Sequence, residues 1–247
     1  MPAPADLLDV ALRRDPAGPL LTYYDDATGE RTELSATTLA NWVAKTANLM
    51  RDDVGAVPGD RVAVLLPAHW QTAAVLLAAW STGAVVTRRP DGTVAAFTAD
   101  VPAAEGAGEV FALSLAPLGR GFATGPPPGS RDYSADVRVM GDAWSGPAVP
   151  DAAPALETPD GVVAAGDLVE IAVRRAAELG LATGDRVLST LAWDGPMSWI
   201  DGLLVPMAAG ASLVLVANAD AGALPVRAEA ERVTATQGVE VPGLRPL

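Results

Sequence analysis

The chain has 247 residues, half of them hydrophobic, which suits one large or two small globular domains and does not suit a disordered protein. Its 30 acidic residues outnumber the 17 basic residues, and the net charge of −13 argues against nucleic acid and membrane surfaces as partners. There is no cysteine, so disulfides and thiolate chemistry are excluded; no signal peptide is visible, and we expect a cytoplasmic protein.

The first predicted elements begin at Ser35, whose hydroxyl can accept a hydrogen bond from an unpaired backbone N–H and so cap a helix. Apolar residues then recur at helical spacing over 39–50. A Pro-Gly-Asp turn at 58–60 leads into an apolar run over 62–66. That run has the length and composition of a buried parallel strand.

A second helix is predicted over 69–82, where Gly83 ends it, because a residue without a Cβ readily takes a left-handed conformation. Residues 84–87 form the next strand. The whole stretch 62–87 lacks Asp, Glu, Lys and Arg and is long enough to span a membrane. Pro, Gln, Ser, Thr and Gly interrupt it, however, and the strand–helix–strand interpretation favours a globular protein.

The middle of the chain is less regular. Residues 94–98 and 110–115 are predicted to be strands. The segment 117–147 is rich in Pro and Gly and is interpreted as a surface loop with a short helix over 133–140. The following segment, 147–159, is the expected boundary between two halves of the chain.

A second block repeats the order of the first. A helix is predicted over 167–179, a strand over 187–191, a helix over 197–209 and a strand over 211–216. Later in the chain we expect a helix near Arg227.

A strand over 233–236 comes next, and the proline-containing residues 238–247 are expected to fray. These elements suggest two α/β subdomains, residues 1–147 and 148–247.

The two blocks share a motif as well as an order of elements. Gly-Asp-Arg-Val at 59–62 recurs at 184–187, and residues 35–87 match 163–216 as an internal repeat. Adjacent parallel strands joined through a helix require a right-handed crossover. The predicted fold class is therefore α/β, with two pseudo-symmetric units whose largely parallel sheets are covered by helices.

Open α/β sheets bind ligands beyond the carboxyl ends of their strands. Two turns meet this condition, 67–70 after the first strand and 193–196 after its counterpart. The candidate ligand-binding residues in and beside these turns are Trp193, Asp194, Gly195, Trp199, Asp201, His69 and Trp70. The alternative is that the tryptophans are ordinary core packing, that the aspartates cap helices, and that His69 begins a helix in solvent.

Four stretches, 57–67, 78–86, 184–191 and 202–211, resemble the N-terminal domain of the adenylate-forming (acyl-CoA synthetase, AMP-binding) superfamily. That superfamily includes acyl- and aryl-CoA synthetases, luciferases and peptide-synthetase adenylation domains. The resemblance covers roughly residues 6–239, and the size and layout also resemble a small actinobacterial group related to the superfamily. It implies an AMP-binding fold and a reaction in which ATP activates a carboxylate and a thiol then accepts the acyl group.

The resemblance also identifies a phosphate-loop remnant, which comprises Thr158, Pro159, Asp160 and Gly161. In the superfamily this loop is rich in Ser, Thr and Gly and ends in Pro-Lys-Gly, so that backbone amides and a lysine surround the phosphates. Asp160 stands where the lysine is expected, and a carboxylate repels a triphosphate. The alternative is an ordinary turn, for which Thr-Pro-Asp-Gly is suitable.

Two further superfamily elements differ here. An aromatic residue or histidine lies near the acyl pocket; by spacing Gly195 takes the histidine position, and Trp193 could wall the pocket. The adenine-binding, ribose-binding and C-terminal lid elements would lie beyond Leu247. We therefore predict no catalytic residue, and ATP or AMP is implied by the resemblance without support from the loop. No His, Asp or Glu cluster has the spacing of a metal site.

Three hypotheses result. The first is a degenerate adenylate-forming relative, a pseudoenzyme that binds a small apolar or aromatic carboxylate or an adenine nucleotide without full adenylation chemistry. The second is an active ligase that is completed by a partner chain carrying the missing domain. The third is a non-enzymatic scaffold or interaction protein. The expected partners are a small molecule and either a partner chain or a second copy of the protein.

Overall fold

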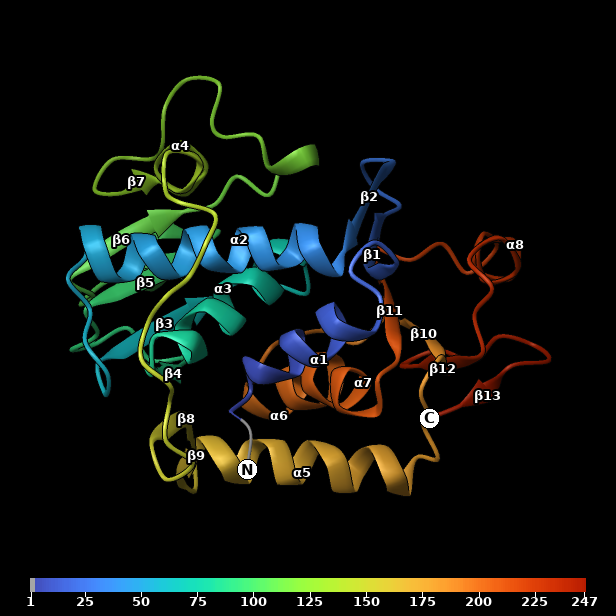
Figure 1. The fold of residues 1–247 in the computed structure, drawn as a ribbon. Coiled ribbons are helices and arrows are strands. Elements are labelled where there is room, and N and C mark those ends of the chain that lie inside the picture. The colour runs from blue at the N-terminus through green and yellow to red at the C-terminus, as the bar shows by residue number, and fades with distance from the viewer. Residues whose placement is uncertain (1–2) are drawn as a thin grey trace.

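Two β-sheets with helices between and outside them make up the computed structural model, which describes residues 3–247 (Figure 1). The six-stranded sheet contains, in spatial order, β13 (Arg245–Pro246), β12 (Ala235–Gln237), β10 (Arg186–Ser189), β11 (Ser212–Ala217), β1 (Pro19–Asp25) and β2 (Glu30–Ser35). The seven-stranded sheet contains β7 (Arg131–Asp132), β6 (Glu109–Ala112), β5 (Ala95–Thr98), β3 (Arg61–Leu65), β4 (Val85–Thr87), β8 (Pro154–Thr158) and β9 (Gly161–Ala164). Neighbouring strands are parallel except in the hairpins β1–β2 and β8–β9, so the predicted α/β class with largely parallel sheets is confirmed.

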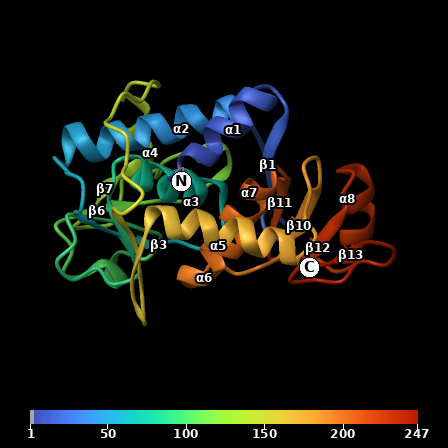
Figure 2. The same ribbon diagram turned by 60° about the horizontal axis from the view of Figure 1, so that its bottom comes forward.

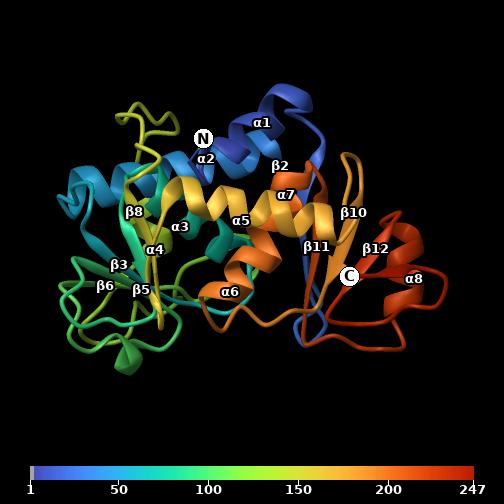
Figure 3. The ribbon, with the colours of Figure 1, turned by 90° about the horizontal axis from the view of Figure 1, so that it is seen from below.

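The α-helices are α1 (Asp6–Arg14), α2 (Ala36–Asn48), α3 (Trp70–Ser81), α4 (Tyr133–Arg138), α5 (Ala165–Glu178), α6 (Pro196–Trp199), α7 (Val205–Ala209) and α8 (Leu224–Ala230). Short 3₁₀ turns lie at Val101–Ala104 and Pro117–Gly119, and π-helical turns at Leu49–Asp53 and Ile200–Leu204. Helices α2, α3, α5 and α7 lie between the two sheets, whereas α8 covers the outside of the six-stranded sheet (Figure 3). Helix α5 follows β9 and leads to β10, and thus connects the sheets (Figure 2).

The alternation of side chains along each strand separates a central core from two outer ones. Val62 and Val64 of β3 face the helices between the sheets, whereas Ala63 faces the 3₁₀ turn on the outside. On β10 and β11, Leu188 and Val214 face α8. Because both faces of each sheet are covered, its central strands are largely apolar.

The strand–helix–strand unit predicted over 62–87 is confirmed as β3, α3 and β4. Every residue of α3 is buried, since the helix contacts both sheets, which explains the long uncharged stretch. Ser35 caps α2 by accepting a hydrogen bond from the Thr38 N–H (3.1 Å), and Gly83 follows α3 with φ of 75°. Within residues 3–247 we find no helix that is long and apolar enough to cross a membrane.

The two Gly-Asp-Arg-Val turns make the same local hydrogen bonds. Asp60 Oδ2 accepts from the Val57 N–H (2.8 Å), and Asp185 Oδ2 accepts from the Ala182 N–H (2.9 Å). Each carboxylate thus closes the turn that begins its strand, as in other Asp-stabilised turns. These aspartates are structural.

The glycines of these turns also have equivalent partners. The Gly59 N–H donates to the carbonyl oxygen of Gly83 (2.8 Å), and the Gly184 N–H donates to that of Gly210 (3.3 Å). All four glycines have positive φ, which a residue with a Cβ rarely adopts. Each unit therefore ties the start of its first strand to the loop before its second strand.

Two predictions about single elements need correction, and one hairpin was not predicted. The helix predicted over 197–209 is broken into α6, a π-helical turn and α7; Pro206, which has no N–H to donate, lies at the start of α7. The end of the chain does not fray in the structure, because β13 pairs with β12 and Arg245 Nη1 donates to the Leu179 carbonyl (2.7 Å). The hairpin β1–β2 has no counterpart among the predicted elements.

The sheets draw on both ends of the chain. Strands β1 and β2 join the six-stranded sheet with β10–β13, while β8 and β9 join the seven-stranded sheet with β3–β7. Sheet membership therefore does not follow the boundary between residues 147 and 148. The division into subdomains 1–147 and 148–247 stays a prediction.

Candidate functional site

A cleft of about 530 Å³ lies where four parallel strands end. Strands β3 and β4 reach it from one sheet, and β10 and β11 reach it from the other. Its walls are formed by residues 65–68, 190–194 and 216–219, together with Arg88. The volume lies within the range of about 300–1,000 Å³ that is typical of small-molecule sites. The rule that open sheets bind ligands beyond their carboxyl ends leads to this place.

The cleft has apolar walls and two charged side chains. Leu66 and Val216 are buried beneath it, and the Trp193 side chain is 1% exposed. Arg88 and Asp194 are the charged residues on its walls in the described part of the chain. An apolar surface with few polar groups is suited to a small amphipathic compound.

Trp193 is held in place by a glycine on the neighbouring helical segment. A Cβ added at Gly202 would collide with the indole Nε1 of Trp193. The absence of a side chain at residue 202 therefore lets the indole pack closely against the backbone there. Trp193 is a rigid wall of the cleft.

His69 does not lie in solvent, which corrects the alternative considered for it. Its Nδ1 accepts a hydrogen bond from the Gln71 N–H (3.1 Å), so it caps α3 as a helix-start residue, but its side chain is 1% exposed. The ring contacts Tyr23 edge-on at 4.4 Å between centroids. Burial lowers the pKa of His69 to about 3, so the imidazole is neutral near pH 7. It does not reach the cleft.

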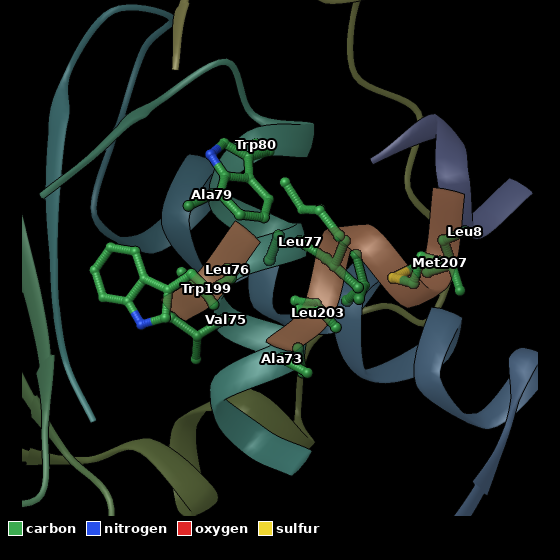
Figure 4. Packing of buried hydrophobic residues seen from close by; sticks show 14 of the residues in the cluster. Leu8, Ala73, Val75, Leu76, Leu77, Ala79, Trp80, Trp199, Leu203 and Met207 are labelled. Atoms are coloured by element: carbon green, nitrogen blue, oxygen red, sulfur yellow. The ribbon is translucent and has the colours of Figure 1, made fainter. Parts of the chain in front are cut away.

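Two of the three candidate tryptophans lie elsewhere in the core. The Trp70 ring packs against Trp42 at 5.0 Å, and Trp199 lies beside Val75 and Leu76 of α3 (Figure 4). Neither tryptophan lines the cleft. The structure therefore does not bring the three candidate tryptophans into one pocket.

The polar candidates divide in the same way. Asp194 is exposed on the cleft wall, and Gly195 immediately follows as the N-cap residue of α6. Asp201 instead forms an ion pair with Arg175 (Nε–Oδ1, 2.6 Å) away from the cleft. Burial raises the pKa of Asp201, and the charge of Arg175 opposes that rise.

The phosphate-loop remnant is the tight turn between β8 and β9. Thr158 pairs with Gly161 across the hairpin, and Thr158 Oγ1 donates to the Gly161 carbonyl (2.9 Å). Only Pro159 and the exposed Asp160 lie between the strands, and Pro159 has no N–H. This turn cannot surround a phosphate with backbone amides, and it lies outside the cleft.

The lysine charge is not supplied from elsewhere in the chain. Lys45 is the single lysine of the sequence, and its Nζ donates to the Met140 carbonyl (2.6 Å). The residues at the hairpin therefore do not fit the triphosphate of ATP. No group of three or more His, Cys, Asp or Glu side chains in residues 3–247 is arranged to hold a metal ion.

Arg88 is the site residue that sequence reasoning missed. It directly follows β4, whose carboxyl end lies beside that of β3. Applying the strand-end rule to β4 as well as to β3 and β10 would have identified it.

Comparison with known proteins decides the family. No family model matches the chain. A protein of Mycobacterium tuberculosis (strain ATCC 25618 / H37Rv) described as a TIGR03089 family protein is 52% identical over 241 residues, which cover 92% of this chain and 95% of that protein. The chain belongs to the TIGR03089 family.

Solved structures similar to this TIGR03089 family member are acyl-CoA synthetases and related ligases. Acetoacetyl-CoA synthetase from Streptomyces lividans matches with a TM-score of 0.78 and 21% identity, over 95% of this chain and 42% of that chain. The anthranilate CoA ligase AuaEII, in complex with anthranoyl-AMP, matches with a TM-score of 0.74 and 13% identity, over 96% and 48%. The N-terminal domain of FACL13 from Mycobacterium tuberculosis matches with 0.70 and 18%, over 98% and 66%.

The TIGR03089 family member therefore shares its fold with part of each of these chains, in FACL13 with the N-terminal domain, which confirms the resemblance as a relation of fold. It spans 42% to 66% of the length of the solved chains named above.

Proposed function

We propose that this protein binds a small apolar or aromatic carboxylate in the cleft between the two sheets and does not complete adenylation chemistry by itself. The observation that carries the proposal is the cleft at the carboxyl ends of β3, β4, β10 and β11, with Trp193 as a rigid wall. An aromatic wall and aliphatic neighbours favour a ligand with an apolar body.

The names of the structural neighbours support this class of ligand. One neighbour is an acetoacetyl-CoA synthetase, and another is an anthranilate CoA ligase solved with anthranoyl-AMP. Acetoacetate and anthranilate are small carboxylates, and the second is aromatic. An adenine nucleotide is the other ligand that the fold suggests.

The hairpin at 158–161 argues against a complete reaction. A triphosphate beside Asp160 would meet a negative charge where the related enzymes place a lysine, and the turn offers no amide cradle. We therefore expect binding without release of pyrophosphate.

Two measurements on the purified full chain test the proposal. Isothermal titration calorimetry with benzoate, 3-phenylpropionate, octanoate, AMP and ATP measures binding, and ATP–pyrophosphate exchange with the same acids measures adenylation. Binding of at least one acid without exchange is the expected result. Absence of heat and of thermal stabilisation with every compound would contradict it.

A second candidate is a ligase completed by a partner chain. The observation in its favour is that the chain spans 42% of the acetoacetyl-CoA synthetase to which it is similar. Pyrophosphate exchange that appears only when a co-purifying chain is present would support this candidate. A co-purifying chain without exchange would favour the scaffold hypothesis. Cytoplasmic location, a partner chain and a homo-oligomer remain predictions.

A further inference from the structure

Arg88 brings a positive charge to the cleft wall of a chain whose net charge is −13. It is half-buried on the wall of the cleft, and its Nη1 lies 3.5 Å from the carbonyl oxygen of Val64, at the outer limit of a hydrogen bond. Among the described residues, no carboxylate lies within the 4.0 Å that defines an ion pair with it.

The neighbouring arginines show that acidic partners are close by and are used. Arg61 at the start of β3 pairs with Glu157 (Nη2–Oε2, 2.7 Å), and Arg89 pairs with the other oxygen of the same carboxylate. Glu157 thus serves two arginines on the outside of the cleft. The guanidinium of Arg88, one residue away, has no acidic partner among residues 3–247.

We propose that Arg88 binds the carboxylate of the ligand and restricts the cleft to compounds with a single negative charge; this rests on the proposed function. A guanidinium without an acidic protein partner presents parallel N–H donors to a carboxylate, which makes a charge-assisted, two-point hydrogen bond. The ligand then lies with its acid at the end of β4 and its apolar body against Trp193.

The second charge on the walls explains the limit to one negative charge. Asp194 follows Trp193 and is exposed on the cleft wall. One arginine and one aspartate leave the walls without net charge. A compound with two or more phosphates would meet a single cation and a carboxylate, so its further charges would lose water without gaining partners.

Matched acids and amides test the role of Arg88. Calorimetry is carried out with the full chain on 3-phenylpropionate and 3-phenylpropionamide and on octanoate and octanamide, each pair having nearly the same shape. The wild-type protein is expected to bind each acid about 10-fold or more tightly than its amide. In Arg88→Met the preference should disappear, while the Kd of the amide changes by less than about 2-fold.

Control variants separate the local charge from general effects. Arg89→Met removes the same charge one residue away, outside the cleft, and should keep the preference for the acid. Arg88→Lys keeps the positive charge but not the planar, two-point donor geometry of the guanidinium. It should recover part of the preference for the acid over the amide. Circular dichroism and a thermal midpoint check that each variant folds. If Arg88→Met does not fold, Arg88→Gln replaces it.

The outcomes distinguish this inference from the proposed function. Equal binding of acid and amide by the wild type, or an acid preference that survives in both Arg88→Met and Arg88→Gln, overturns the role of Arg88 while leaving ligand binding intact. Tighter binding of ATP than of either acid overturns the single-charge limit. Binding of none of these compounds overturns both proposals.

Discussion

The two strand–helix–strand units share one frame of hydrogen bonds and differ in the connection between the first strand of each and its helix. After β3 the chain enters α3 directly, with His69 as a buried cap. After β10 it makes a longer turn through Trp193 and Asp194 before a helix that is broken at Ile200–Leu204. The shared hydrogen bonds stabilise the fold, whereas the turn after β10 supplies the aromatic wall of the cleft and one of its two charged residues.

The largest expected effect comes from the arginines of the two equivalent turns. The Arg186 side chain is 10% exposed and pairs with Glu231 (2.5 Å), whereas the Arg61 side chain is 33% exposed and shares Glu157 with Arg89. Arg186→Met removes the arginine that pairs with Glu231 Oε2, while Arg31 and Tyr24 still hold Oε1, and should lower the free energy of unfolding by about 2–3 kcal/mol. Arg61→Met should lower it by about 1 kcal/mol or less.

Urea denaturation of both variants measures this difference in the free energy of unfolding.

Burial by itself would raise the pKa of Glu231, but hydrogen bonds from Tyr24, Arg186 and Arg31 lower it to about 2. Arg186→Met should therefore also move the onset of acid unfolding to higher pH. Equal losses in the two variants would show that the two turns are energetically equivalent despite their different burial.

The next largest effect concerns the broken helix of the second unit. Gly202→Ala forces the Trp193 indole out of its position beside residue 202. The substitution should lower the free energy of unfolding by about 1–3 kcal/mol and abolish ligand binding in the cleft. Gly195→Ala is the matched control, because Gly195 has extended φ of −170° and nothing lies within 4 Å of an added Cβ. Denaturation and calorimetry on both variants check this prediction, and unchanged binding in Gly202→Ala would contradict it.

The buried cap of the first unit predicts a pH dependence of stability. The unfolded chain binds a proton at His69 below its ordinary pKa of 6.5, whereas the folded protein stays neutral there down to about 3. Stability is therefore fully present above pH 6.5 and falls as the pH drops below it. The expected loss from this group between pH 7 and pH 5 is about 2 kcal/mol.

His69→Asn keeps an acceptor for the Gln71 N–H and should remove that part of the pH dependence in urea denaturation at the two pH values. The chain has one histidine, so its proton NMR signal needs no assignment among several. A signal that titrates between pH 8 and pH 5 in the folded protein would rule out a buried, neutral imidazole.

The smallest expected effect is at the hairpin. Asp160 is exposed in a two-residue turn, so Asp160→Lys should change the free energy of unfolding by about 0.5 kcal/mol or less. It supplies the lysine that the superfamily resemblance implies here but not a loop of amides around the phosphates, and we expect no ATP–pyrophosphate exchange. ATP–pyrophosphate exchange in this variant would mean that the wild-type hairpin lacks only a positive charge at residue 160.

Local features were predictable from the sequence because their partners lie a few residues away. The cap at Ser35, the end of α3 at Gly83 and the turn closed by Asp60 each depend on contacts over three to four positions or on the φ of one residue. The burial of His69 could not be predicted in this way, since it depends on Tyr23, 46 positions earlier in the chain.

The candidate site was predictable in part. The strand-end rule located Trp193 and Asp194, because it needs only the order of parallel strands. It did not separate them from Trp70 and Trp199, because the direction of a side chain depends on which face of its helix meets the core. Arg88 follows the end of β4, to which the rule also applies, but only the tertiary structure separates it from Arg89, which lies outside the cleft.

By itself, the amino-acid sequence determined the α/β class, the strand–helix–strand units and the absence of a lysine at the hairpin, since periodicity, turn residues and residue identity are properties of short segments. Only the tertiary structure decided that β1 lies beside β11 and that strands from both sheets end at one cleft. It also decided that Glu157 takes Arg61 and Arg89 and leaves Arg88 without a carboxylate partner among the described residues. These facts depend on segments far apart in the chain, which come together only when the helices between the sheets bury their apolar faces.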